Sequence, residues 1–332
     1  MATDTERTRV DPSSRTKPAH KRGPPLSQNL GGIYLGVLGW SLRSIEVAVA
    51  LVRPTRRLNA LSSTLAGADA NSPVVLLAVF SLAFWAFIVA SSALLFPVAL
   101  VLWAVTAPFD RRLRAQHAFT CFWASLYSWL NPLWRVRVEG REYVRADRTY
   151  VMVANHQSFL DILILFRLFR HFKWVSKAEM FRIPAIGWNM WLNRYVRLRR
   201  GQADSIARMM TECERHLAEG SSIMIFPEGT RSPDGRLKAF KHGAFTLAQR
   251  ARVPLLPIVI EGTANALPKH GFVLRGRHAI RVRVLEEIPI ERIVDRGVDE
   301  LSSDVRALFA RELREPETMA PAVGVAAERA RA

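Results

Sequence analysis

From about residue 130, short hydrophobic runs recur along the chain and predict strands. The run at 133–140, LWRVRVEG, alternates between apolar and polar residues with a period of two, as a strand with one buried face does. Four further runs predict strands and lie at 149–155, 221–229, 254–262 and 279–287. The first of these four, TYVMVAN, is almost wholly apolar before its final residue, so we expect it to be buried.

Helical patterns separate these runs. We predict helices over 158–172, 204–220 and 243–251. The second helix has its apolar side chains on one face: Ile206, Met210, Cys213 and Leu217. Gly220 is placed to end it, because glycine adopts the left-handed conformation common after a helix. Strands alternating with helices predict an α/β fold, a layered sheet with flanking helices.

The ends of the chain lack this alternation. Residues 1–30 are polar and charged without periodicity, so we predict disorder for them, and we predict disorder for the tail at 316–332 as well. Residues 33–52 are mostly apolar but carry Arg43 and Glu46 on one helical face. Because a charge pair inside a bilayer is costly, these residues predict an amphipathic helix at a membrane interface.

Residues 73–108 contain no charged residue. One span needs about 20 apolar residues and two spans with a turn need more than about 40, so a tilted span or a hairpin turning near Ser91–Pro97 both fit. Basic residues flank the run on both sides, which favours a hairpin with both ends cytoplasmic. The alternative is a buried hairpin in the core of a soluble protein. We therefore expect an apolar helical membrane anchor over 31–115, followed by a catalytic domain over 116–315 on the cytoplasmic face of a bacterial inner membrane.

Charge and cysteine content narrow the classes of partner. The chain has 47 Lys and Arg against 29 Asp and Glu, a net charge of +18, which points to nucleic acid, anionic lipid or an acidic carrier protein. The uncharged run favours lipid, and the sequence has no nucleic-acid recognition motif, so we expect no nucleic acid. Cys121 and Cys213 lie far apart without metal-ligand spacing, which argues against a disulfide framework or a zinc site.

A candidate catalytic pair lies in the motif NHQSFLD at 155–161, where the strand at 149–155 ends and a helix begins. Ser158 suits the N-cap and Asp161 the capping-box position. A strand–loop–helix corner lets His156 fold back onto the carboxylate. An imidazole held in this way can remove a proton from a substrate hydroxyl. The alternative is that the two residues are only a polar loop residue and a helix cap.

Two further motifs carry candidate binding groups. The motif FPEGTRS at 226–232 follows a predicted strand; Gly229 allows close approach of the backbone to a ligand, and the Arg231 guanidinium matches a phosphate. The alternative is an ordinary turn with surface charges. Residues 177–201 mix aromatic, apolar and basic side chains, which suits lipid headgroups or acyl chains, or else a solvated basic edge of a core helix.

Four blocks in this order resemble the glycerolipid acyltransferases of the 1-acyl-glycerol-3-phosphate type, over about residues 130–290. The family's His, four residues, Asp block is matched at His156 and Asp161, and its Phe-Pro-Glu-Gly-Thr-Arg-Ser block in full at 226–232. A middle block is matched at Lys177, Ile183, Pro184, Gly187 and Arg200, although Arg194 stands where the family usually has glycine. The last block is matched at Val253, Pro254 and Pro257.

The resemblance implies an O-acyltransferase of phospholipid biosynthesis that makes phosphatidic acid from 1-acyl-glycerol-3-phosphate at a phospholipid membrane. His156 would be the general base and Asp161 its orienting partner. The acceptor hydroxyl would attack the thioester of acyl-CoA or acyl carrier protein, with no covalent acyl-enzyme, metal or bound cofactor. The residues implied to bind substrate are Glu228, Gly229, Thr230, Arg231, Arg200 and Lys177.

Two alternatives stay open. The same reaction could use another acceptor, such as glycerol-3-phosphate, another lysophospholipid or a lyso-aminolipid, with the same catalytic residues. The chain could instead be a non-catalytic lipid-binding protein, although the intact pair of His156 and Asp161 argues against it.

Overall fold

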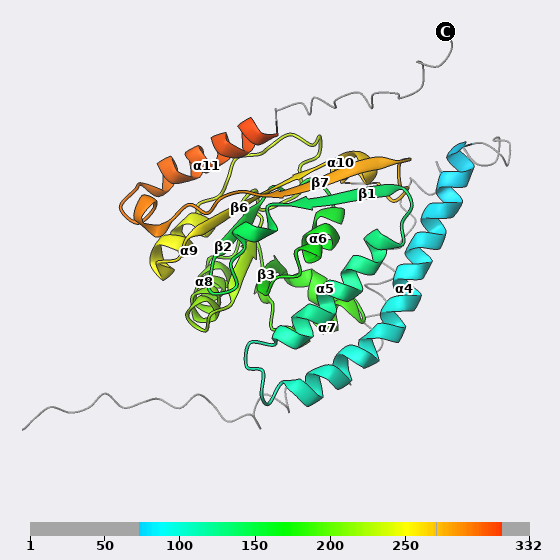
Figure 1. Ribbon diagram of the computed structural model, residues 1–332, viewed down its shortest axis with the longest axis horizontal. Helices are drawn as coiled ribbons and strands as arrows, with labels where there is room; N and C mark the ends of the chain where they lie inside the picture. The colour runs from blue at the N-terminus through cyan, green and yellow to red at the C-terminus, as the bar shows by residue number, and fades with distance from the viewer. Residues whose placement is uncertain (1–72, 270, 314–332) are drawn as a thin grey trace, which may run out of the picture.

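The computed structural model describes residues 73–269 and 271–313, which form one seven-stranded sheet with helices on both faces (Figure 1). The sheet order is β1-β7-β6-β2-β5-β3-β4, and all neighbouring strands are parallel except β6 and β7. The predicted α/β class, a layered sheet with flanking helices, is confirmed. The predictions for 1–30, 33–52 and 316–332 lie outside the described residues.

All five predicted strands are present. They are β1 (Trp134–Glu139), β2 (Val151–Ala154), β5 (Ser222–Ile225), β6 (Leu255–Glu261) and β7 (His278–Val284). Two strands were not predicted: β3 (Phe172–Lys177) and β4 (Val196–Leu198).

The helix predicted over 158–172 is wrong in extent. It is α6 (Leu160–Leu165) with a 3₁₀ turn, η2 (Phe166–Leu168), after which Phe169 takes a φ of 49° and the chain enters β3. The sequence contains no signal for the end of this helix, because residues 166–172 contain neither glycine nor proline.

The two faces of the sheet are covered by different helices. Alternate side chains of β2 point to opposite faces: Val151 and Val153 into one apolar cluster, Met152 and Ala154 into the other. The Val151 side is covered by α8 (Ala203–Ala218), α9 (Gly243–Ala251) and α11 (Val298–Glu312). The Met152 side is covered by α4 (Pro73–Thr106), α5 (Arg114–Trp129), α6 and α7 (Ile186–Leu192). The remaining helical turns are η1 (Arg141–Tyr143), η3 (Ala178–Arg182), α10 (Thr263–Ala266) and η4 (Ile290–Arg292).

Helix α8 ends as predicted but its buried face differs at one position. Gly220 takes a φ of +79° just beyond the helix. Ile206, predicted on the buried face, is 43% exposed. In the first turn Ser205 takes the inward place, because its Oγ accepts the N–H of Arg199 at 2.9 Å.

The uncharged run forms a single helix, α4, of 34 residues that continues through Pro97. The favoured hairpin turning near Ser91–Pro97 is therefore wrong. This stretch is held on α5 instead, since the hydroxyls of Ser91 and Ser92 lie 3.1 and 3.2 Å from Tyr127 Oη. Among the described residues, α4 is the one helix long and apolar enough to cross a membrane, judged by length and composition alone.

Helix α4 lies lengthwise along the domain, beside α5 (Figure 1). Its buried residues run from Ser81 to Ala99, about 27 Å of helix. Near its start, Ser81 Oγ accepts the N–H of Leu274 at 2.9 Å, and Phe84 packs on Trp134 with ring centroids 5.3 Å apart. The predicted boundary between 31–115 and 116–315 falls inside α5.

Candidate active site

The predicted motifs meet at one edge of the sheet. Strands β6, β2, β5, β3 and β4 are parallel, so their carboxyl ends lie together, where open α/β sheets bind ligands. His156 follows β2, Arg231 follows β5, and Arg200 follows β4; Lys177 ends β3, and Thr263 follows β6. Blocks far apart in the sequence therefore converge because parallel strands point the same way.

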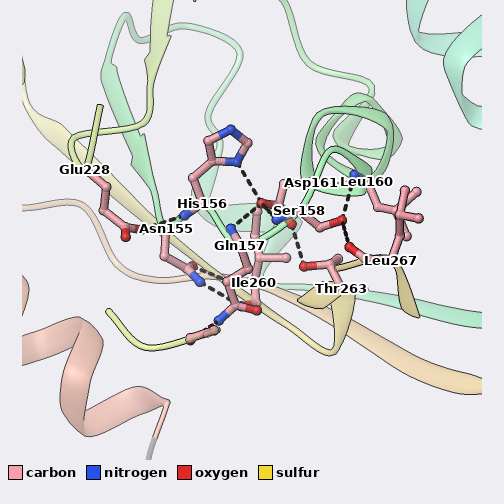
Figure 2. Close-up of polar contacts among 11 residues, drawn as sticks. Asn155, His156, Gln157, Ser158, Leu160, Asp161, Glu228, Ile260, Thr263 and Leu267 are labelled. Carbon is pink, nitrogen blue, oxygen red and sulfur yellow. Dashed lines mark hydrogen bonds and ion pairs between the residues drawn. The ribbon is translucent and has the colours of Figure 1, made fainter. Parts of the chain in front are cut away.

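His156 and Asp161 contact each other directly, as predicted. The imidazole Nδ1 lies 2.8 Å from Asp161 Oδ2, and the carboxylate is fully buried (Figure 2). The same Oδ2 accepts the backbone N–H groups of Gln157 and Ser158 at 2.6 and 2.8 Å. The bond to Ser158 N–H is the one a capping box predicts. The predicted cap residue differs, however, because Ser158 lies two residues before α6 begins at Leu160.

These contacts fix the tautomer of His156. The backbone N–H groups of Gln157 and Ser158 can only donate, so Asp161 Oδ2 is an acceptor, and His156 Nδ1 must supply the hydrogen. The lone pair is then on Nε2, the ring nitrogen that points away from Asp161 in Figure 2. No described residue hydrogen-bonds Nε2. The imidazole is therefore oriented to accept a proton from a bound molecule.

The ring and backbone of His156 are held from the loop after β5. Phe226 stacks on the imidazole, with centroids 3.9 Å apart and planes 8° from parallel. The His156 N–H donates to Glu228 Oε1 at 2.7 Å, and its carbonyl accepts the N–H of Ser232 at 2.8 Å. Sequence reasoning did not single out Phe226 as a site residue, although it begins the matched FPEGTRS block.

Glu228 is placed differently from its predicted role in substrate binding. It is 3% exposed, and its two oxygens accept the backbone N–H groups of His156 and Lys238. Burial raises the pKa of its carboxyl, which these two hydrogen bonds oppose. Because both oxygens are engaged by the protein, the contacts make Glu228 a residue that positions the loop of His156.

Gly229, Arg200 and Arg231 are predicted to bind the acceptor, and this role stays a prediction. Gly229 has a φ of +69°, a left-handed conformation that glycine adopts without steric cost, and the end of the Lys241 side chain lies against it. Arg231 is half-buried, and burial lowers the pKa of its guanidinium. The negative charge of Asp161 opposes this lowering of the pKa, and the positive charge of Arg200 adds to it.

Lys177 and Thr230 are not hydrogen-bonded to the pair formed by His156 and Asp161. Lys177 is exposed, with Nζ 3.6 Å from a carboxylate oxygen of Glu179, and Thr230 is half-buried. Within the described part of the chain, neither makes a hydrogen bond or ion pair with His156 or Asp161. Their roles in substrate binding stay predictions.

The sequence of this chain is similar to those of known acyltransferases. The family model described as Acyltransferase matches residues 135–261. The chain is 40% identical over 203 residues to a 1-acyl-sn-glycerol-3-phosphate acyltransferase of Chlamydomonas reinhardtii, covering 60% of each chain. It is 38% identical over 209 residues to the chloroplastic enzyme of that name from Arabidopsis thaliana, covering 62% of this chain and 56% of the relative. The matches thus span less than two thirds of these relatives' lengths.

A solved structure supports the fold. The crystal structure of the 1-acyl-sn-glycerophosphate acyltransferase PlsC from Thermotoga maritima superposes with a TM-score of 0.59, covering 71% of this chain and 95% of that one, at 24% sequence identity. Residues 135–261 thus match the acyltransferase family model, and the predicted resemblance to glycerolipid acyltransferases of the 1-acyl-glycerol-3-phosphate type is confirmed by the similarity to these relatives.

Proposed function

We propose that this chain transfers a fatty acyl group from acyl-CoA or acyl carrier protein to the free hydroxyl of 1-acyl-glycerol-3-phosphate, making phosphatidic acid. The observation that carries the proposal is His156, whose Nδ1–H is held by buried Asp161 and whose Nε2 faces away with a free lone pair. The names of the relatives supply the acceptor.

The chemistry needs one base and no covalent acyl-enzyme. Nε2 of His156 takes the proton of the acceptor hydroxyl as its oxygen attacks the thioester carbonyl. The new C–O ester bond forms, the C–S bond breaks, and the imidazolium returns the proton to the departing thiolate. During these steps Asp161, 2.8 Å from Nδ1, stabilises the positive charge on the ring.

The acceptor's phosphate would bind near Arg231 and Arg200. A half-buried guanidinium binds phosphate more strongly than an exposed one, since fewer water molecules compete for it. Gly229, which has no side chain, would let a ligand approach the backbone of this turn once the flexible Lys241 side chain moves aside. In this arrangement the phosphate anchors the lysolipid while its hydroxyl reaches Nε2 of His156.

The membrane contact would be made by α4 lying in the bilayer surface. One face of α4 is packed on the domain along about 27 Å, while its outer face exposes apolar side chains such as Leu94 (74%) and Val101 (63%). A helix attached along its length cannot cross the bilayer without carrying the domain in with it. We therefore propose interfacial attachment, with the domain on the cytoplasmic face because arginines follow the helix at 111, 112 and 114.

The test is transfer of a labelled acyl chain by the purified full chain in lipid. Acyl-CoA and acyl carrier protein are each offered with lysophosphatidic acid, glycerol-3-phosphate and other lysolipids. We expect labelled phosphatidic acid from lysophosphatidic acid, lost in His156→Ala and retained in His278→Ala, a histidine at the start of β7 that belongs to none of the predicted motifs. Transfer to a different acceptor alone would keep the mechanism but overturn the proposed substrate.

A further inference from the structure

The Asp161 carboxylate has a hydrogen-bond donor that lies outside its own loop. Oδ2 is held by His156, Gln157 and Ser158, all within five residues. Oδ1 accepts the hydroxyl hydrogen of Thr263, 102 residues away, over an O–O distance of 2.5 Å. Asp161 and Thr263 are both fully buried.

The fold brings Thr263 to this place through the turn after β6. Gly262 has a φ of +84°, and a Cβ there would lie 2.1 Å from the Ala279 carbonyl oxygen, so the turn must pack tightly on β7. Thr263 then begins α10, immediately beside the loop that follows β2. Its hydroxyl therefore has a position fixed by strand pairing.

The same segment holds the catalytic loop at two further points (Figure 2). The Asn155 side chain accepts the N–H of Ile260 and donates to its carbonyl, at 2.8 and 2.9 Å. Ser158 Oγ donates to the Leu267 carbonyl at 2.6 Å. Residues 260–267 thus form hydrogen bonds with both ends of the 155–158 loop. Among these residues, Thr263 is the one that hydrogen-bonds the Asp161 carboxylate.

The Thr263 hydroxyl has two chemical consequences for His156. It fixes the rotation of the carboxylate, so that Oδ2 stays in line with Nδ1. It also withdraws charge from Asp161, because a donated hydrogen bond stabilises negative charge on the accepting oxygen. The strength of the Asp161–His156 interaction therefore depends on Thr263.

We infer that Thr263 is a positioning residue of the acyl-transfer reaction, which acts through Asp161 on the orientation and basicity of His156. The inference rests on the proposed function, because it assumes that His156 is the base. It adds a third member to the dyad, supplied by the segment after β6, and assigns that segment a catalytic rather than a purely structural task.

Thr263→Val and Thr263→Ser test the inference in the full chain with acyl-CoA and lysophosphatidic acid. Valine keeps the shape but removes the hydroxyl. We expect kcat to fall about 10- to 100-fold, the range for losing a hydrogen bond to a charged group, with acceptor KM unchanged. Serine restores the hydroxyl and should recover most of kcat.

The pH profile separates positioning from a structural role. Without the hydroxyl, the negative charge of Asp161 is no longer shared with a hydrogen-bond donor at Oδ1. This charge then favours the protonated imidazole more strongly. The acid limb of kcat/KM against pH should therefore move to higher pH in Thr263→Val. Thr120→Val is the matched control. Thr120 is a buried threonine in the hydrogen-bond network of α5 and α7, and its loss should lower the melting temperature without moving the profile.

The outcomes distinguish the two claims. The inference would be overturned if Thr263→Val kept the wild-type kcat and pH profile. The proposed function would remain intact in that case, provided that wild-type transfer is lost in His156→Ala. A fall in kcat that serine does not recover, or that Thr120→Val reproduces with the same profile shift, would also overturn it. An equally active His156→Ala would instead overturn the proposed function.

Discussion

Replacing Asp161 by asparagine removes a buried charge while keeping a side chain of nearly the same shape. The geometry dictates how the amide would sit. Oδ2 faces three N–H donors, whereas Oδ1 faces the hydroxyl of Thr263, which can accept as well as donate. The amide oxygen should therefore replace Oδ2 and the NH₂ group should face Thr263, so that His156 keeps its tautomer.

The expected loss then comes from the missing charge. When His156 becomes an imidazolium, its charge and that of Asp161 are centred about 4 Å apart, and an effective dielectric constant of about 20 gives an attraction of about 4 kcal/mol. At 1.36 kcal/mol per factor of ten, kcat/KM should fall about a thousandfold. The protein should still fold, because the three N–H donors around Oδ2 keep their acceptor and the Thr263 hydroxyl, which loses its own acceptor, gains a donor in the amide.

The assay is acyl transfer to lysophosphatidic acid, measured beside thermal unfolding. Asp204→Asn is the control, since Asp204 is an exposed residue in the first turn of α8. A folded Asp161→Asn variant with less than tenfold loss would refute the argument that the carboxylate charge stabilises the imidazolium. A variant that fails to fold would refute the argument that the amide fits.

Three further predictions follow from other parts of the structure. Arg231→Ala should raise the acceptor KM roughly 30-fold, from the loss of about 2 kcal/mol of charge-assisted hydrogen bonding, and leave the donor KM unchanged; a rise in donor KM alone would reverse the assignment. Leu94→Lys on α4 should reduce sedimentation with anionic vesicles, whereas Ile206→Lys on α8 should not, and equal binding by both variants would contradict attachment through α4. Burial lowers the pKa of His171 to about 3 and of His216 to about 4, so both stay neutral when folded but bind protons when unfolded near pH 6.5. The stability that these two histidines contribute should be full above that pH and decline as pH falls toward 4, and melting temperatures that match at pH 7 and 5 would contradict this.

The sequence predicts the strands whose side-chain pattern agrees with their burial. Strand β3 does not follow this pattern, because Lys173, its second residue, is only 1% exposed. Its ammonium is accommodated by donating to the carbonyls of Arg112 and Asn193, both at 2.8 Å and both distant in sequence. A pattern rule that treats lysine as a surface residue cannot anticipate these partners.

The candidate site likewise contains a part that a local motif predicts and a part that depends on the pairing of distant strands. His156 and Asp161 are close in sequence, and a motif of seven residues contains the whole contact. Thr263 and the carboxylate of Glu228 reach them only through the pairing of β2 with β6 and β5, which no local pattern specifies. The single helix α4 likewise depends on packing against Tyr127, far along the chain.

The most direct test of the central claim is formation of labelled phosphatidic acid from lysophosphatidic acid by the wild-type chain and by His156→Ala. The account predicts transfer by the wild type and its loss in a folded variant. Equal transfer by both proteins would contradict the assignment of His156 as the base, and absence of transfer to any lysolipid by the wild type would contradict acyl transfer itself.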